Sequence, residues 1–108
     1  MTEAQIERAI LFALSSRPDI RLFKNEVGRA IDPRTGAYVQ FGLCVGSSDL
    51  IGIVAPRGRF LALEVKSETG KPTPQQLAFI AMINAMGGVG RIVRSVAEAL
   101  AAADEAAR

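Results

Sequence analysis

An acidic and a basic side chain stand two residues apart at the end of the run Phe60–Lys66, which reads FLALEVK. The run is apolar, and it is the clearest strand candidate in the chain. Successive side chains of a strand point to opposite faces, so Glu64 and Lys66 project to the same side while Leu63 and Val65 project to the other. The spacing therefore predicts a carboxylate and an ammonium group that emerge together from a buried strand.

A second carboxylate, Asp49, begins the preceding apolar segment, Asp49–Ala55. The residues between the two segments, Pro56–Arg59, predict a tight turn and hence an antiparallel hairpin. In such a hairpin the start of the first strand lies opposite the end of the second, so we expect Asp49 beside Glu64. Two adjacent carboxylates repel each other unless a proton or a cation lies between them. Hard oxygen ligands of this kind suit Mg²⁺ or Mn²⁺.

These residue types together indicate hydrolysis of a phosphodiester. A divalent cation held by Asp49 and Glu64 would bind the phosphate and lower the pKa of a bound water, and the backbone carbonyl of Val65 would add a neutral ligand. Lys66 would orient that water and stabilise charge on the phosphate. The alternative interpretation is a structural protein in which Glu64 and Lys66 form an ordinary ion pair.

Composition removes most competing chemistry. The chain of 108 residues has no histidine, which excludes Ser-His-Asp and Cys-His hydrolases and histidine-ligated zinc enzymes. Its one cysteine, Cys44, allows no disulfide within the chain and no cysteine-rich zinc site. We expect an intracellular protein, in the cytoplasm of a bacterial or infected host cell, without a membrane span. The formal charge of +2 permits a polyanionic partner without requiring one.

The elements that must position these residues follow from hydrophobic period and capping residues. Thr2 with Gln5, Thr73 with Gln76, and Ser95 with Glu98 predict capping boxes at three helices. Gly28–Gly42 is rich in loop residues, with a turn signal at Asp32–Gly36 and room for a short strand at Tyr38–Phe41. The predicted elements are helix Glu3–Ser15, strands Ile20–Val27, Asp49–Ala55 and Phe60–Lys66, a helix from Thr73 to Gly87–Gly88, strand Val89–Val93, and a last helix to about Ala107.

The order α-β-β-β-α-β-α predicts one α/β domain spanning residues 1–108, with a mixed central sheet flanked by helices. The helix between the last two strands implies a right-handed parallel crossover.

Asp49 followed by Glu64-x-Lys66 resembles the motif of the PD-(D/E)XK nuclease superfamily. Finer details resemble its VRR-NUC (virus-type replication-repair nuclease) branch. Ser48 is a departure, because the superfamily name expects proline before the aspartate. The segments that carry the resemblance are Lys24–Gly28, Gly46–Gly52, Leu63–Lys66 and Thr73–Phe79.

The resemblance implies a restriction-endonuclease-like fold with an α-β-β-β-α-β core. It also implies a divalent-metal-dependent DNA endonuclease that uses Mg²⁺ or Mn²⁺ and acts on branched DNA such as Holliday junctions or flaps. Stand-alone members resemble Holliday-junction resolvases, which act as symmetric dimers, so a homodimer is expected. The alternative is a non-catalytic DNA-binding or assembly module on the same fold, although Asp49, Glu64 and Lys66 are all present.

The resemblance also implies two further site residues. One is an acidic residue on the first helix that helps to hold the metal; Glu3 lies within an apolar stripe and is favoured over Glu7. Both acids alternatively offset the positive helix N-terminus. The other is a glutamine at the start of the helix after Glu64-x-Lys66; Gln76 is favoured over Gln75, with helix capping as the alternative role.

Four residues are the expected DNA contacts. Two of them match the family pattern and two lie on the long loop: Lys24 and Asn25, then Arg29 and Arg34. Tyr38 and Phe41 have side chains that stack on bases, but core packing is the favoured interpretation for both.

Overall fold

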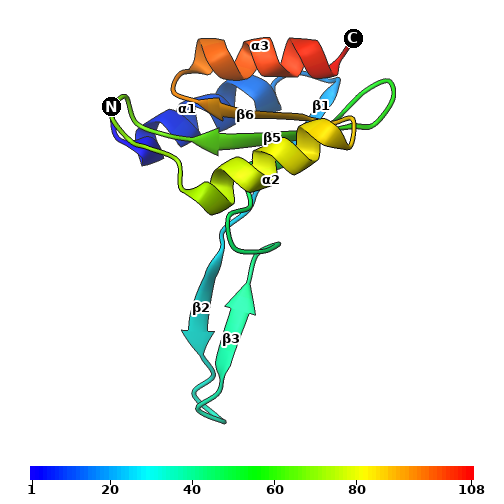
Figure 1. The fold of residues 1–108 in the computed structure, drawn as a ribbon. Coiled ribbons are helices and arrows are strands. Elements are labelled where there is room, and N and C mark those ends of the chain that lie inside the picture. Colours follow the sequence, from blue (N-terminus) through cyan, green and yellow to red (C-terminus); the bar gives the residue numbers. More distant parts are fainter.

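The computed structural model describes all residues 1–108 and contains three helices and six strands (Figure 1). Strands β1, β4, β5 and β6 form one sheet in that order. Strand β4 is antiparallel to both β1 and β5, whereas β5 and β6 are parallel, so the sheet is mixed as predicted. The elements are α1 Glu3–Ser15, β1 Ile20–Lys24, β2 Gly28–Ile31, β3 Tyr38–Phe41, β4 Leu50–Val54, β5 Arg59–Val65, α2 Pro74–Ala85, β6 Val89–Val93 and α3 Val96–Ala106.

The sheet lies between two helical layers, with α1 and α3 on one face and α2 on the other (Figure 1). Strand β5 shows the predicted alternation. Leu61, Leu63 and Val65 join the main core against α1 and α3, whereas Ala62 joins a smaller cluster with Phe79 of α2. Because Glu64 follows the same alternation, it projects to the α2 side of the sheet.

The helix boundaries follow the capping residues. Thr2 and Thr73 both form complete capping boxes, with Gln5 and Gln76 respectively, and α1 spans the predicted residues. The prediction of a capping box at the third helix is wrong in one detail. The hydroxyl of Ser95 accepts the N–H of Glu98, but the Glu98 carboxylate accepts the N–H of Arg94, one residue before the cap.

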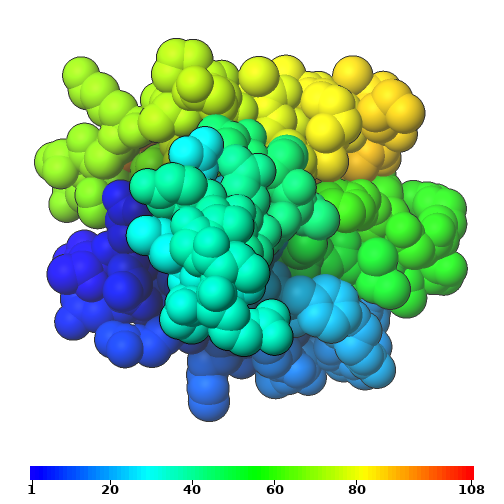
Figure 2. All heavy atoms as spheres, turned by 90° about the horizontal axis from the view of Figure 1, so that it is seen from below, coloured from blue at the N-terminus to red at the C-terminus, as the bar shows by residue number.

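Residues 28–41 were expected to be mainly loop, and the structure corrects this prediction. Gly28–Ile31 pairs antiparallel with Tyr38–Phe41 as a separate two-stranded hairpin. The hairpin projects away from the helices and the main sheet, and from below it covers the centre of the molecule (Figure 2). Tyr38 is 72% exposed and Phe41 is 45% exposed, so the prediction that they pack in the core is wrong.

Two strand ends differ from the prediction near the site. Strand β1 ends at Lys24 and not at Val27, because the Asn25 side chain turns inward and the chain leaves the sheet toward the hairpin. Strand β4 begins at Leu50, which leaves Asp49 just outside the ladder. No helix has the length and apolar character needed to cross a membrane.

Candidate active site

Asp49 and Glu64 lie together where β4 begins and β5 ends. The register pairs Leu50 with Leu63, so its continuation by one residue sets Asp49 opposite Glu64. One carboxylate oxygen of Asp49, Oδ2, accepts the backbone N–H of Val65 at 2.9 Å. The predicted hairpin geometry is therefore confirmed, and Asp49 is held against the end of β5.

Glu64 is a buried carboxylate with an uncommitted oxygen. The residue is 2% exposed, and its Oε1 atom has no hydrogen-bond partner. Burial first, and then the neighbouring Asp49, raise the pKa of Glu64 to about 8, and the opposing effect of Lys66 is smaller. Burial and the nearby negative charge of Asp49 both disfavour the ionised form of Glu64, and a cation bound beside it would favour that form.

Lys66 supplies the positive charge closest to this pair. Its Nζ atom lies 3.9 Å from Oε2 of Glu64, and the side chain is 11% exposed. This distance is too long for a good hydrogen bond, and Nζ has no other hydrogen-bond partner within the chain. The ammonium group is thus held beside the carboxylates with its donors free for a further group.

An acidic cleft of about 560 Å³ opens in front of these residues. Asp49 and Val65 reach its wall, whereas Glu64 and Lys66 are buried behind it. The charged residues that line the cleft are one lysine and four acids: Lys24, Glu3, Glu7, Glu26 and Asp49. Such a surface repels a phosphate and attracts a cation.

Both candidate acids of α1 line this cleft, but their partners differ. Glu7 forms an ion pair with Lys24 at 3.5 Å. Glu3 has no ion-pair partner, and its charge contributes to the raised pKa of Glu64. The structure therefore favours Glu3 as the free carboxylate. No three acidic, histidine or cysteine side chains converge closely enough to form a complete ligand set, so Glu3 stands outside the Asp49–Glu64 pair.

The donor set fits a hard divalent cation. It offers two adjacent carboxylates, one of which has an unpartnered oxygen, and a third carboxylate across the cleft at Glu3. Oxygen donors of this kind suit Mg²⁺ or Mn²⁺, and the remaining positions of either ion are commonly filled by water.

Gln76 reaches the cleft from the first turn of α2. Its Oε1 atom accepts the N–H of Thr73 in the capping box, which leaves its amide NH₂ group without a partner in the chain. Gln75 does not line the cleft, and its backbone packs against Gly46 instead. A Cβ atom at Gly46 would lie 2.7 Å from that backbone, and the φ angle of +86° also favours glycine. This contact holds the segment before Asp49 against the start of α2.

The predicted DNA contacts fall into two groups. Lys24 lines the cleft and is half-exposed, and the acids Glu26 and Glu7 raise its pKa. Arg29 and Arg34 lie on the projecting hairpin rather than in the cleft, and the Arg34 side chain is 86% exposed.

Asn25, another predicted DNA contact, lines the cleft but has a structural role as well. It is buried; its amide donates to Ser47 Oγ at 2.8 Å and to the Ser48 carbonyl at 2.9 Å, and its Oδ1 accepts the N–H of Leu43. Its polar atoms are therefore committed inside the protein, where they fasten the segment that leads to Asp49. Sequence reasoning missed this role and that of Ser47, because neither the asparagine nor the serine carries a local sign of a long-range bond.

Fold and site together define a nuclease-type α/β domain. The sequence matches the VRR-NUC domain family over residues 3–97, and the chain belongs to this family. A solved structure described as a VRR_NUC domain is 20% identical, with 94% of each chain covered and a TM-score of 0.62, which shows the fold. No curated protein matches the sequence. Family membership implies DNA as the substrate, and nucleases of the family generally depend on divalent metals.

Proposed function

We propose that this protein is a divalent-metal-dependent DNA endonuclease with selectivity for branched DNA such as Holliday junctions or flaps. The observation that carries the proposal is the pairing of Asp49 with Glu64 beside Lys66, in which the Glu64 carboxylate has a pKa of about 8. Family membership supports the same reaction class.

Asp49 and Glu64 are the residues that would hold Mg²⁺ or Mn²⁺, together with the carbonyl of Val65. When bound there, such a cation supplies Lewis-acid activation of the scissile phosphate and of a water molecule. Glu3 would contribute from across the cleft through a bridging water, since it does not converge with the other two carboxylates.

Lys66 and Gln76 complete the proposed site. The ammonium group of Lys66 orients the attacking water and stabilises the negative charge that develops on the phosphate. The free amide group of Gln76 donates to the phosphate or to that water from the wall of the cleft. Both groups are held by regular elements, Lys66 directly after β5 and Gln76 in α2, which fixes their positions.

DNA would be held outside this centre. Lys24 lies at the edge of this acidic cleft, and Arg29 and Arg34 would add cationic contacts along the hairpin. A second copy of the chain would place two such centres about a twofold axis and allow cuts in two strands. Exposed apolar side chains of the hairpin and its base support this homodimer: Val27, Ile31, Tyr38, Val39, Phe41, Leu43 and Val45.

Cleavage assays test the proposed function. We expect the protein to cut labelled junction or flap DNA with Mg²⁺ or Mn²⁺ and to stop when EDTA is added. Lys66→Ala and Asp49→Asn should each lower the rate by about 100-fold or more, as the loss of a transition-state charge contact does elsewhere. Lys71→Ala is a matched control because Lys71 is exposed and lies outside the cleft.

One outcome of these assays would contradict the proposed endonuclease activity. A folded wild type that binds junction DNA in a salt-dependent way, yet leaves duplex, flap and junction DNA intact with both metals, is the non-catalytic binding module and not an endonuclease.

A further inference from the structure

The turn Ser67–Gly70 directly follows Lys66 and lies next to the site. It is compact, because the N–H of Gly70 donates both to the Ser67 carbonyl and to Ser67 Oγ, at 3.2 and 3.1 Å. The N–H of Lys66 donates to the Val93 carbonyl at 3.0 Å, which ties the start of the turn to the end of β6.

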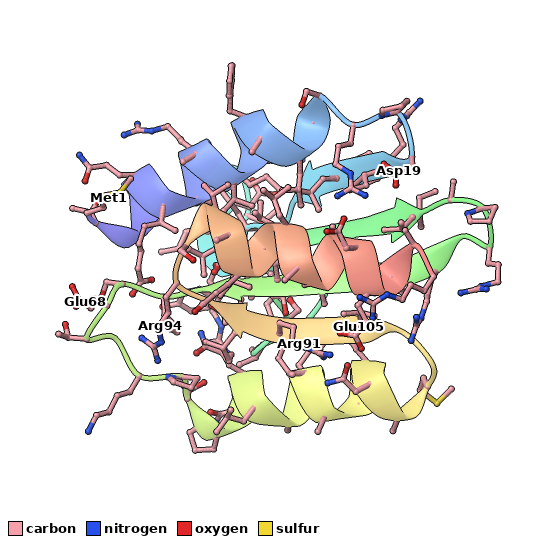
Figure 3. The ribbon with its side chains drawn as sticks, turned by 90° about the horizontal axis from the view of Figure 1, so that it is seen from above. Met1, Asp19, Glu68, Arg91, Arg94 and Glu105 are labelled. Atoms are coloured by element: carbon pink, nitrogen blue, oxygen red, sulfur yellow. The ribbon has the colours of Figure 1, made fainter.

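Arg94 holds this turn from one side. Its Nη1 atom donates to the carbonyls of Ser67 and Gly70 at 2.6 and 2.7 Å, and more weakly to that of Glu68 at 3.4 Å. Figure 3 shows Arg94 and Glu68 at the same edge of the molecule. The backbone of Arg94 is itself anchored by the Glu98 carboxylate at 2.7 Å. A planar, permanently charged guanidinium suits such a cluster of carbonyl oxygens.

Glu3 lies against the other side of the same turn. A Cβ atom added to Gly70 would meet Oε2 of Glu3 at 3.0 Å and Oγ of Ser67 at 3.0 Å. Gly70 is thus bonded to Arg94 and lies close to the Glu3 carboxylate, so a displacement of the turn changes the room available to that carboxylate.

We propose that Arg94 is a positioning residue of the site: by binding three carbonyls of the Ser67–Gly70 turn, it fixes the chain after Lys66 and the place of the Glu3 carboxylate. The role that this gives to Glu3 and Lys66 rests on the proposed function. Arg94 itself does not line the acidic cleft.

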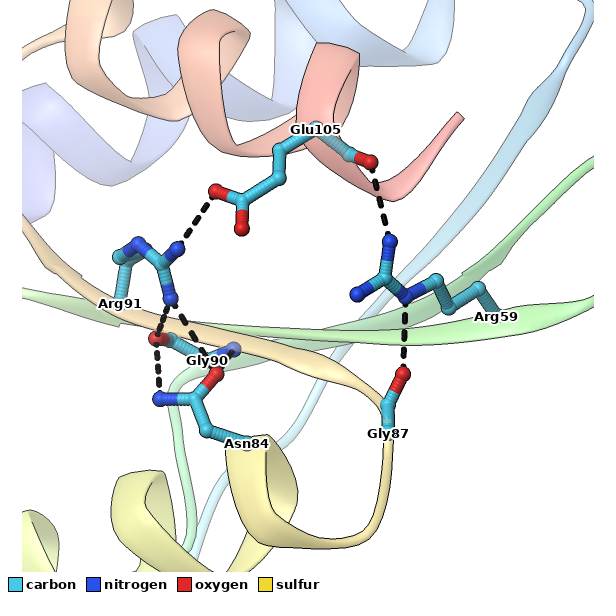
Figure 4. Close-up of polar contacts among 6 residues, drawn as sticks. All are labelled: Arg59, Asn84, Gly87, Gly90, Arg91 and Glu105. Carbon is cyan, nitrogen blue, oxygen red and sulfur yellow. Dashed lines mark hydrogen bonds and ion pairs between the residues drawn. The ribbon is translucent and has the colours of Figure 1, made fainter. Parts of the chain in front are cut away.

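The chain offers a matched control in Arg91, which lies in β6, the strand that ends just before Arg94. Arg91 also binds a backbone carbonyl, that of Gly90 at 2.7 Å, and pairs with Glu105 of α3 (Figure 4). The Arg91 side chain bonds to Asn84, Gly90 and Glu105 and makes no bond to the turn beside Glu3. Loss of Arg91 therefore removes a comparable arginine without touching the turn.

The test is the Mn²⁺ affinity of the protein without DNA, measured by isothermal titration calorimetry. Groups that orient metal ligands typically change affinity by about 10–100-fold, so Arg94→Ala should weaken Mn²⁺ binding by about tenfold or more, while Arg91→Ala leaves it unchanged. Because Arg94 acts through Glu3, Arg94→Ala should cost much less in a Glu3→Gln background. Equal losses in both backgrounds overturn the proposal, and so does a wild type that binds no Mn²⁺.

A second variant covers the case in which Arg94→Ala does not fold. Gly70→Ala keeps Arg94 and would bring a methyl group to 3.0 Å from Oε2 of Glu3, so that carboxylate must shift slightly and Mn²⁺ binding should weaken, by less than in Arg94→Ala. Unchanged affinity in folded Gly70→Ala and Arg94→Lys proteins contradicts the proposal. If the wild type binds Mn²⁺ but cuts no DNA, the endonuclease proposal fails while the coupling between Arg94 and Glu3 is still decided by the affinities.

Discussion

Glu64 is the residue whose environment departs most from that of an ordinary acid. It ends a buried strand, faces Asp49, and has one oxygen without a partner. A group of this kind lowers the stability of the metal-free protein, since a buried carboxylate must either keep a proton or remain unpaired. Strongly shifted pKa values of this kind cluster at functional sites.

The raised pKa of Glu64 predicts how stability changes with pH when no metal is present. Below its ordinary pKa of 4.5 the carboxyl is protonated in both the folded and the unfolded protein, and between 4.5 and about 8 only the folded protein keeps the proton. The contribution of Glu64 to the free energy of unfolding is therefore lost as the pH rises from 4.5 to 8. Even half of this shift corresponds to about 2 kcal/mol, because one pKa unit is about 1.4 kcal/mol.

Urea denaturation in EDTA at pH 5 and pH 8 measures this effect. We expect the Glu64→Gln protein to have a higher free energy of unfolding than the wild type at pH 8. Its free energy of unfolding should also fall less than that of the wild type between pH 5 and pH 8. Addition of Mn²⁺ should stabilise the wild type more at pH 8 than at pH 5, since the metal replaces a proton there. Identical pH dependence in both proteins would show that Glu64 is not the titrating group.

The three central residues could be predicted from the sequence because strand alternation and a hairpin are local patterns. Glu64 and Lys66 share a face by their spacing, and a tight turn brings Asp49 to them. The role of Asn25 could not be predicted in this way. Its bonds reach Ser47 and Ser48, more than 20 residues along the chain, and only the folded structure brings these residues together.

At the scale of elements, the helices followed the sequence most closely. Their first turns are specified by local capping bonds, as at Thr2 and Thr73. The short strand allowed at Tyr38–Phe41 is β3, but β2 and its pairing with β3 were missed. Neither face of this hairpin packs on the core, so β2 lacks the alternation of apolar and polar residues that marks a half-buried strand. The same absence of a core contact explains why Tyr38 and Phe41 are exposed.

The start of α2 allows capping and function to be separated at Gln76. Thr73→Ala and Gln76→Ala each remove one of the two reciprocal bonds of the capping box. Both should therefore lower the free energy of unfolding by about 1 kcal/mol, as lost N-caps do. Only Gln76→Ala also removes an amide from the cleft, so it alone should slow DNA cleavage, by on the order of tenfold or more.

Chemical denaturation and single-turnover cleavage of the two variants, side by side, provide the comparison. Equal cleavage rates in the two variants would assign Gln76 to the helix cap alone. A lower rate in Thr73→Ala than in Gln76→Ala would instead point to the position of the whole helix.

At the scale of the molecule, the site and the hairpin are neighbours with opposite character. The cleft gathers acids, whereas the projecting hairpin carries Arg29, Arg34 and exposed apolar side chains. Phe41 contributes to both the cleft and the hairpin, because it lines the cleft and its ring lies against Gly28 of the paired strand β2. A two-stranded hairpin is at best marginally stable alone, so a partner on its apolar side chains would stabilise it.

The proposed homodimer gives the hairpin such a partner. We expect the wild type to sediment as a dimer at micromolar concentration and the Val39→Glu protein to sediment as a monomer. Val39 is 47% exposed on β3. A twofold contact through the hairpin would place two such glutamates near each other, where they repel. Phe12→Glu is the matched control, since Phe12 is 86% exposed and belongs to α1 rather than to the hairpin. A wild type that is monomeric at all concentrations contradicts the dimer. A dimeric Val39→Glu protein moves the contact away from the hairpin, and a monomeric Phe12→Glu protein moves it to α1.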